Sequence, residues 1–138
     1  MQDKYIQSIR YKLQKRVRRL NSASHQLFSS NLRSFFAFFE ASPILCGIRD
    51  ELLAAVPIET LDKDIALLLS DDQGMPVGET EAHEAALGYR LLKHCVDTPG
   101  YELWRAGWRY DAENVNDAMD KLRTVFLEPF YEYVDEHI

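Results

Sequence analysis

Apolar residues recur every three or four positions along most of this chain. In the first segment they are Ile6, Ile9, Leu13, Val17 and Leu20. This spacing stacks side chains along one side of an α-helix. No segment shows the sustained alternation of apolar and polar residues that is typical of a half-buried strand. The pattern therefore predicts an all-α fold without a sheet, and the short connections favour a bundle of about six helices.

Capping residues, prolines and glycines divide the chain into its expected helices. Ser42 is a good capping residue, and Pro43 after it is tolerated in a first helical turn. Pro129 lies inside the last helix and should kink or split it, because proline removes one backbone hydrogen bond. Helices are expected over residues 3–40, as one helix or two, and over 43–55, 58–70, 80–98, 101–110 and 115–138, with a loop over 71–79.

Length and composition predict one domain. A chain of 138 residues, of which 46% are hydrophobic and 28% charged, is long enough to bury a sizeable core. We therefore expect a single helical domain over residues 1–138. The last helix reaches the chain end without a glycine stop or a polar tail, which leaves open that this domain is the N-terminal module of a larger polypeptide.

Cysteine usage and hydropathy indicate a soluble, cytoplasmic protein. Cys46 and Cys95 occur in apolar helical patterns without CxxC spacing, and we interpret both as reduced core residues. The basic start of the chain is followed by polar NSASHQ, whereas an export signal continues into an apolar stretch. The most apolar segment, residues 35–48, falls short of the roughly 20 apolar residues that span a membrane. No membrane partner is expected.

Signatures of catalysis and of metal binding are largely missing from the sequence. It contains no glycine-rich phosphate loop, no GxSxG elbow, no HExxH helix and none of the Glu-x-x-His pairs of di-iron bundles. Glu79 and His83 are one turn apart, but they lie at a helix start, where the helix dipole favours acidic side chains anyway. The sequence thus predicts no cofactor, no metal site and, on balance, no enzyme.

One enzymatic alternative is kept. Helical ribonucleases of the HEPN type use an arginine with a histidine a few residues later, and Arg18 and Arg19 both stand in that relation to His25. Chance alone supplies about one such match in a chain with this many arginines. An RNase built around Arg19 and His25 is therefore the outlying hypothesis.

The stretch RYKLQKRVRRL makes the first helix strongly basic in a chain whose net charge is −6. Residues 1–33 contain eight Lys and Arg and one Asp, whereas residues 34–138 contain eight positive and twenty-one negative residues. On a helical wheel most of the basic residues lie opposite the apolar stripe. The candidate electrostatic partner-binding residues are Lys12, Lys15, Arg16, Arg18 and Arg19.

A second candidate surface is aromatic. The segment YELWRAGWRY contains Trp104, Arg105, Trp108 and Arg109, and tryptophan and arginine are enriched at interface hot spots. The competing interpretation places the tryptophans in the core. The phenylalanine-rich segment 35–39 poses a similar question, since Phe38 points away from the main stripe and would indicate self-association if it were exposed.

Three interpretations of the basic helix compete: a solvated face of a packed helix, a phosphate-contacting surface for nucleic acid, and a helix lying on an anionic membrane. The acidic remainder of the chain would repel phosphates, and the apolar face carries no Trp or Phe before Phe28 to favour a membrane interface. We therefore expect a non-catalytic protein-interaction, assembly or regulatory module. Its partner is another protein or a second copy in a homo-oligomer, and nucleic-acid binding is the alternative.

Overall fold

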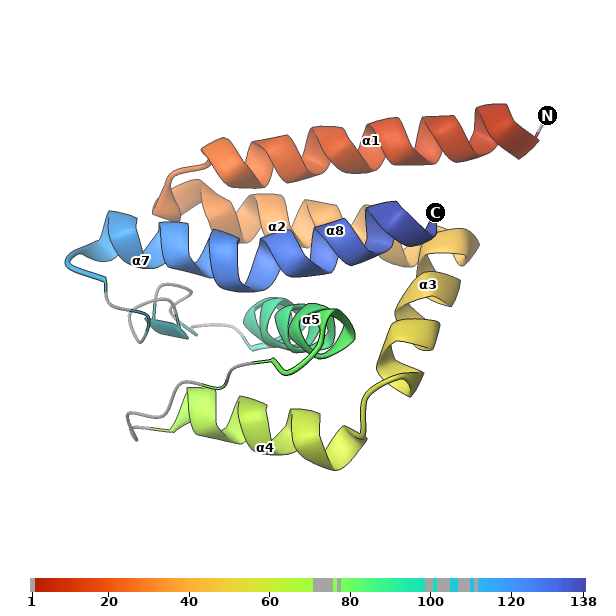
Figure 1. Cartoon of the computed structure of the whole chain (residues 1–138). Coiled ribbons are helices and arrows are strands. Elements are labelled where there is room, and N and C mark those ends of the chain that lie inside the picture. The colour runs from red at the N-terminus through yellow and green to blue at the C-terminus, as the bar shows by residue number, and fades with distance from the viewer. Residues whose placement is uncertain are drawn as a thin grey trace.

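The computed structural model describes residues 2–70, 76, 78–98, 101, 105–106, 110 and 112–138, except for the side chains of Gln2, Asp3 and His25. Its elements are α1 (Gln2–Ser22), α2 (His25–Glu40), α3 (Pro43–Ala54), α4 (Ile58–Leu69), α5 (Glu81–Asp97), α7 (Val115–Leu122), the π-helical turn η1 (Arg123–Leu127) and α8 (Glu128–His137). Because α7, η1 and α8 are continuous, these elements make six helices, and the described residues contain no strand. The predicted all-α bundle is confirmed (Figure 1).

Two helices cover the region that the sequence left open. α1 and α2 are separated by Ala23 and Ser24, and Ser24 has an extended backbone with ψ 163°. The carbonyl oxygen of Ser24 accepts hydrogen bonds from the N–H groups of Leu27 and Phe28 at 3.1 and 2.9 Å, which starts α2. The chain therefore reverses direction here, and α2 runs back along α1 (Figure 1).

Short polar side chains cap the helices that follow. The Ser42 hydroxyl accepts a hydrogen bond from the N–H of Leu45 at 3.3 Å, at the helix start predicted from Ser42 and Pro43. The Thr80 hydroxyl accepts from the N–H of His83 at 3.0 Å and caps α5 in the same way. These bonds satisfy N–H groups that have no partner within the first turn of a helix.

The phenylalanines of α2 form the aromatic centre of the core. Phe35, Phe36 and Phe39 are at most 2% exposed. The Phe130 ring of α8 lies 5.5 Å from that of Phe39 and 5.3 Å from that of Tyr89 on α5. This cluster joins α2, α5 and α8, so the first and last parts of the chain share one core.

Pro129 leaves the C-terminal helix unbroken, and one π-helical turn precedes it. Proline has no N–H to donate to the carbonyl four residues earlier, which disrupts the ordinary α-helical pattern at this point. Instead, the N–H of Glu128 bonds the carbonyl oxygen of Arg123, five residues earlier. A Cβ at Gly88 of α5 would collide with the carbonyl oxygen of Phe126, so a glycine is needed where α5 crosses η1.

Three smaller expectations have mixed outcomes. Cys95 is buried as predicted, whereas Cys46 is half-buried at the start of α3, and both are free thiols. The apolar spacing of the second segment predicts that Leu27 also faces the core, yet it is 60% exposed in the first turn of α2. None of the helices within the described ranges combines the length and the apolar content that crossing a bilayer requires.

Candidate functional site

The outer face of α1, defined as Lys12, Lys15, Arg18 and Arg19, is turned away from the bundle. All four side chains are exposed, whereas the apolar stripe of α1 from position 9 to position 20 is buried. Tyr11 is on the same side of the helix and is 60% exposed. Because the buried stripe holds the helix in place, its charged side remains open to a partner.

Several cations outside this face form ion pairs within the chain, although not all of the described ones do. Arg10, Arg90, Lys93 and Arg123 each form an ion pair with a carboxylate of the same chain. Within the described part of the chain, none of the four side chains of the outer face forms one. No carboxylate among the described residues therefore compensates their charge.

Arg16, the fifth residue of the predicted electrostatic set, lies at the edge of the outer face and makes contacts within the chain. Its guanidinium carbon lies 4.2 Å from the ring centroid of Phe38 on α2. Its Nη1 also donates to the carbonyl oxygen of Lys12 at 3.3 Å. Phe38 is half-buried under this contact, so it does not offer the open aromatic surface that would indicate self-association. Arg16 instead ties α1 to α2.

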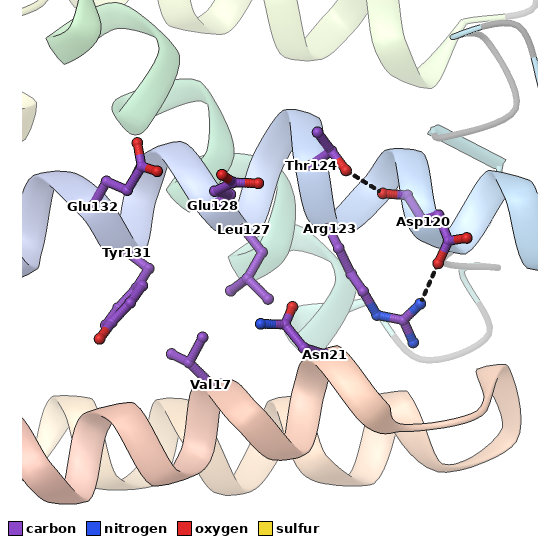
Figure 2. A pocket seen from close by; sticks show the side chains of 9 residues that line it. All are labelled: Val17, Asn21, Asp120, Arg123, Thr124, Leu127, Glu128, Tyr131 and Glu132. Carbon is purple, nitrogen blue, oxygen red and sulfur yellow. Dashed lines mark hydrogen bonds and ion pairs between the residues drawn. The ribbon is translucent and has the colours of Figure 1, made fainter.

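A groove of about 530 Å³ separates α1 from the helix formed by α7, η1 and α8 (Figure 2). The residues that line it are Val17, Asn21, Asp120, Arg123, Thr124, Leu127, Glu128, Tyr131 and Glu132. Figure 2 shows Arg123, Leu127 and Tyr131 reaching toward α1 from the opposite helix. Arg18 lies one turn before the groove residue Asn21 in α1, so the two side chains are neighbours and the groove borders the outer face of that helix.

The acidic stripe, defined as Glu128, Glu132 and Glu136, runs along α8 beside this groove. The three residues are four positions apart, which places them on one side of the helix, and all are exposed. Partial desolvation and the negative charges of Glu128, Glu136 and Glu81 raise the pKa of Glu132 above its ordinary value. Within the described residues no cation pairs with the stripe, so it is a second surface of uncompensated charge.

The aromatic candidate lies largely outside the described residues. Trp104, Trp108 and Arg109 are not among the placed residues, whereas Arg105 is exposed in a helical turn. The proposed nuclease pair is also incomplete, since Arg19 is exposed near the end of α1 but the side chain of His25 is not described. Neither prediction is tested by the structure.

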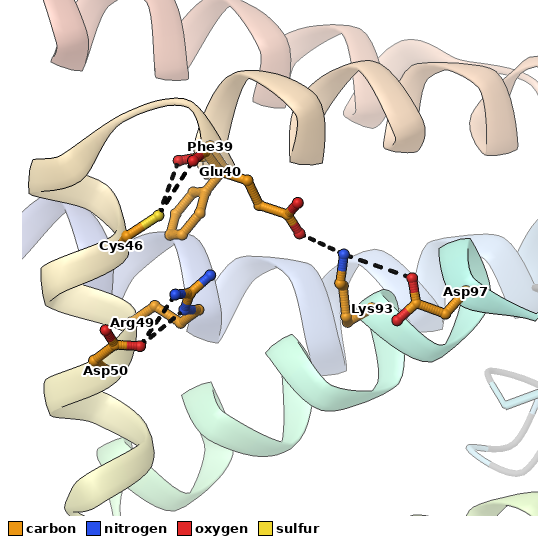
Figure 3. Close-up of polar contacts among 7 residues, drawn as sticks. All are labelled: Phe39, Glu40, Cys46, Arg49, Asp50, Lys93 and Asp97. Atoms are coloured by element: carbon orange, nitrogen blue, oxygen red, sulfur yellow. Dashed lines mark hydrogen bonds and ion pairs between the residues drawn. The ribbon is translucent and has the colours of Figure 1, made fainter.

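A polar network joins the end of α2 to α3 and α5 (Figure 3). Lys93 of α5 bonds Glu40 of α2 and lies 3.5 Å from Asp97. The Cys46 thiol of α3 donates to the carbonyl oxygen of Glu40 at 3.4 Å, and Arg49 pairs with Asp50 at 3.1 Å within α3. Burial lowers the pKa of Lys93, but the hydrogen bond to Glu40 and the nearby carboxylates outweigh it, so the pKa is raised overall. Lys93 therefore keeps its charge, as suits a structural ion pair rather than an amine nucleophile.

A buried pair of side chains connects α4 to the start of α5. His83 Nε2 lies 2.6 Å from the Asp64 carboxylate, and His83 Nδ1 accepts a hydrogen bond from the N–H of Glu79 at 3.2 Å. This pattern assigns the proton to Nε2, which donates to Asp64. The described residues include no group of three His, Cys, Asp or Glu side chains arranged to hold a metal ion. The histidine noted in the sequence thus serves the helix connection.

Comparisons with models of protein families, with curated proteins and with solved structures found no match.

Sequence reasoning found the outer face of α1 but missed the acidic stripe and the groove between them. The regular spacing of Glu128, Glu132 and Glu136 is visible in the sequence and was the available signal. Their position beside α1 is not visible there, because it depends on which helices pack together.

Proposed function

We propose that this protein is a non-catalytic interaction module whose outer face of α1 docks on an acidic protein surface. The observation that carries the proposal is that four exposed cations lie together on one side of α1 and, among the described residues, form no ion pair. Clustered charge of one sign speeds and orients association with a surface of the opposite sign.

The acidic stripe favours a protein partner over nucleic acid. Glu128 and Glu132 line the same groove as Val17 and Asn21 of α1. A nucleic-acid backbone that followed the outer face on this side would approach these carboxylates, whereas a folded protein surface can present cations and carboxylates where each is needed. The proposed partner therefore carries an acidic patch of its own.

Charge reversal tests the proposal. Tagged wild type, a variant with Lys12, Lys15, Arg18 and Arg19 changed to Glu, and a control with Lys63→Glu and Lys121→Glu are compared in cell extract with and without nuclease. Both control residues are exposed and lie outside α1. We expect wild type and control to retain the same partner after nuclease treatment, and the α1 variant to lose it.

Two outcomes would contradict the proposal. Equal recovery of partners by all three proteins would show that the outer face is not the docking surface. Recovery of RNA or DNA that depends on the outer face, together with loss of the bound proteins after nuclease, would favour the nucleic-acid alternative. Purified RNA and duplex DNA oligonucleotides then provide the direct check, since phosphate contacts weaken steeply with added salt.

A further inference from the structure

We propose that the groove between α1 and α8 is an interface at which two copies of this chain pair around a two-fold axis running along the groove. The inference rests on the proposed function, because it names a second copy as the partner of the outer face of α1. It starts from the two margins of the groove, which carry opposite charges.

One margin of the groove is basic. Arg18 lies one turn before the groove residue Asn21, and Lys15 lies one turn before Arg18 on the exposed side of α1. Both side chains are exposed and belong to the outer face. The other margin is acidic, since Glu128 and Glu132 line the groove and continue into the acidic stripe.

Symmetry makes such a surface complementary to itself. Half a turn about an axis along the groove lays the α1 margin of each copy over the α8 margin of the other copy. Basic side chains then face carboxylates twice, once on each side of the axis. An axis across the groove would instead place α1 on α1 and α8 on α8, so that like charges meet. The charge distribution therefore selects the axis along the groove.

The direction of the helices and the groove floor fit this arrangement. α1 and α8 run antiparallel (Figure 1), so each α1 would lie antiparallel to the α8 of the partner as well as to its own. The floor is formed by buried Val17 and Leu127, with half-buried Tyr131 between the two margins. Little apolar area remains to be buried there, so the pairing depends on charge and weakens with salt.

The negative charge crowded on α8 gives the pairing a further source of stability. The pKa of Glu132 is raised by desolvation and by Glu128, Glu136 and Glu81. Cations from a second copy would relieve this repulsion between carboxylates.

Sedimentation of purified protein at low and high ionic strength tests the inference. We expect wild type to reach twice the 16.0 kDa mass of one chain at low salt and to dissociate at high salt. A variant with Lys15→Glu and Arg18→Glu and a variant with Glu128→Lys and Glu132→Lys should each lose the dimer. An equimolar mixture of the two variants should regain it, because the two interfaces of the mixed dimer again pair opposite charges.

A Lys63→Glu control on α4, away from the groove, should dimerise like wild type, and circular dichroism of each variant checks that it is folded. Monomeric wild type at all concentrations, folded variants that still dimerise, or folded variants that do not associate when mixed would overturn the inference. Particles that grow beyond a dimer with concentration would also overturn it, since they indicate head-to-tail association. If wild type is monomeric but its α1-dependent protein partner is still retained, the pairing fails and the proposed function stands.

Discussion

Arg123 of η1 donates a hydrogen bond of 2.9 Å from its Nε to the carbonyl oxygen of Leu20 in the last turn of α1. Its Nη2 also donates to the carbonyl oxygen of Ala23. The last carbonyls of a helix have no partner within that helix, and a positive charge is favourable at that end. The helix that forms one side of the groove therefore also fixes the end of α1.

Replacing Arg123 by Ala should destabilise the protein, because the carbonyl oxygens at the end of α1 lose a charged donor that is only 14% exposed. Hydrogen bonds to charged groups contribute about 2 kcal/mol each, and we expect a loss of that order. Urea unfolding of the variant and wild type measures the difference.

Asp120→Asn is the matched control for Arg123→Ala. Asp120 pairs with Arg123 at 3.0 Å, but its side chain is 72% exposed, so its ion pair contributes under about 1 kcal/mol. If Asp120→Asn destabilises the protein as much as Arg123→Ala does, then Arg123 stabilises the protein through the exposed ion pair and not through the carbonyl oxygens at the end of α1.

Gly88→Ala should be strongly destabilising, since the added methyl group collides with the carbonyl oxygen of Phe126 in η1. Overpacking of this kind costs about 2 kcal/mol, because the backbone of one helix has to move. Gly47→Ala in α3 provides the opposite case. Nothing lies within 4 Å of a Cβ at Gly47, so alanine should stabilise that helix by about 0.5–1 kcal/mol. Thermal unfolding measures the change in melting temperature of each variant relative to wild type. Changes of the same sign in both variants would contradict this description of the α5–η1 crossing.

The pair formed by His83 and Asp64 should show a measurable coupling free energy. A double-mutant cycle with alanine at both positions is expected to give a coupling above about 0.5 kcal/mol, because the two side chains are mostly buried and 2.6 Å apart. Arg90 and Asp62 join the same two helices at 2.7 Å but are more exposed. Their cycle should give a smaller coupling, and a larger one would show that burial does not set the strength of these contacts.

Burial raises the pKa of the Cys95 thiol from 9.0 to about 12. The unfolded chain therefore loses this proton before the native protein does. The buried, protonated Cys95 thiol makes its full contribution to the free energy of unfolding below pH 9.0. This contribution is lost as the pH rises toward about 12. We expect the stability difference between wild type and Cys95→Ala to narrow over this range. A difference that stays constant with pH in urea unfolding would show that the native thiol ionises normally.

Thiol labelling gives an independent measure of the same burial. Cys46 is half-buried, whereas Cys95 is 7% exposed. Maleimide should modify native Cys46 first, and Cys95 only as fast as the protein opens. Equal rates at the two cysteines in the native protein would contradict the placement of Cys95 in the core.

The spacing of apolar residues predicted the helices well because most of them bury one stripe, although α5 is buried on several sides. Ser42 with Pro43 predicted the start of α3 correctly, since capping and the fixed proline backbone act within a few residues. Pro129 was predicted to kink or split the last helix, and it does not split it. Whether a proline breaks a helix depends on its surroundings, and here a π-helical turn packed against Gly88 accommodates it.

The candidate site was predictable only on one of its two sides. Lys12, Lys15, Arg18 and Arg19 face outward because the apolar stripe of α1 must face inward, which the sequence shows directly. Arg16 looked equivalent to them, but its contact with Phe38 arises from the packing of α1 on α2. The groove depends on the approach of two helices about 100 residues apart in the chain, and no local pattern encodes such a pairing.

Zero-length cross-linking of lysines to carboxylates tests the docking role of the outer face most directly. A mixture of natural-abundance and ¹⁵N-labelled protein is cross-linked at low salt, and cross-linked peptides are identified by mass spectrometry. We predict mixed-isotope peptides that join Lys15 to Glu128 or Glu132, and their loss at high salt. The account would be contradicted if the mixed-isotope peptides included neither Lys12 nor Lys15. It would also be contradicted if no mixed-isotope peptides formed and no protein partner depended on the outer face.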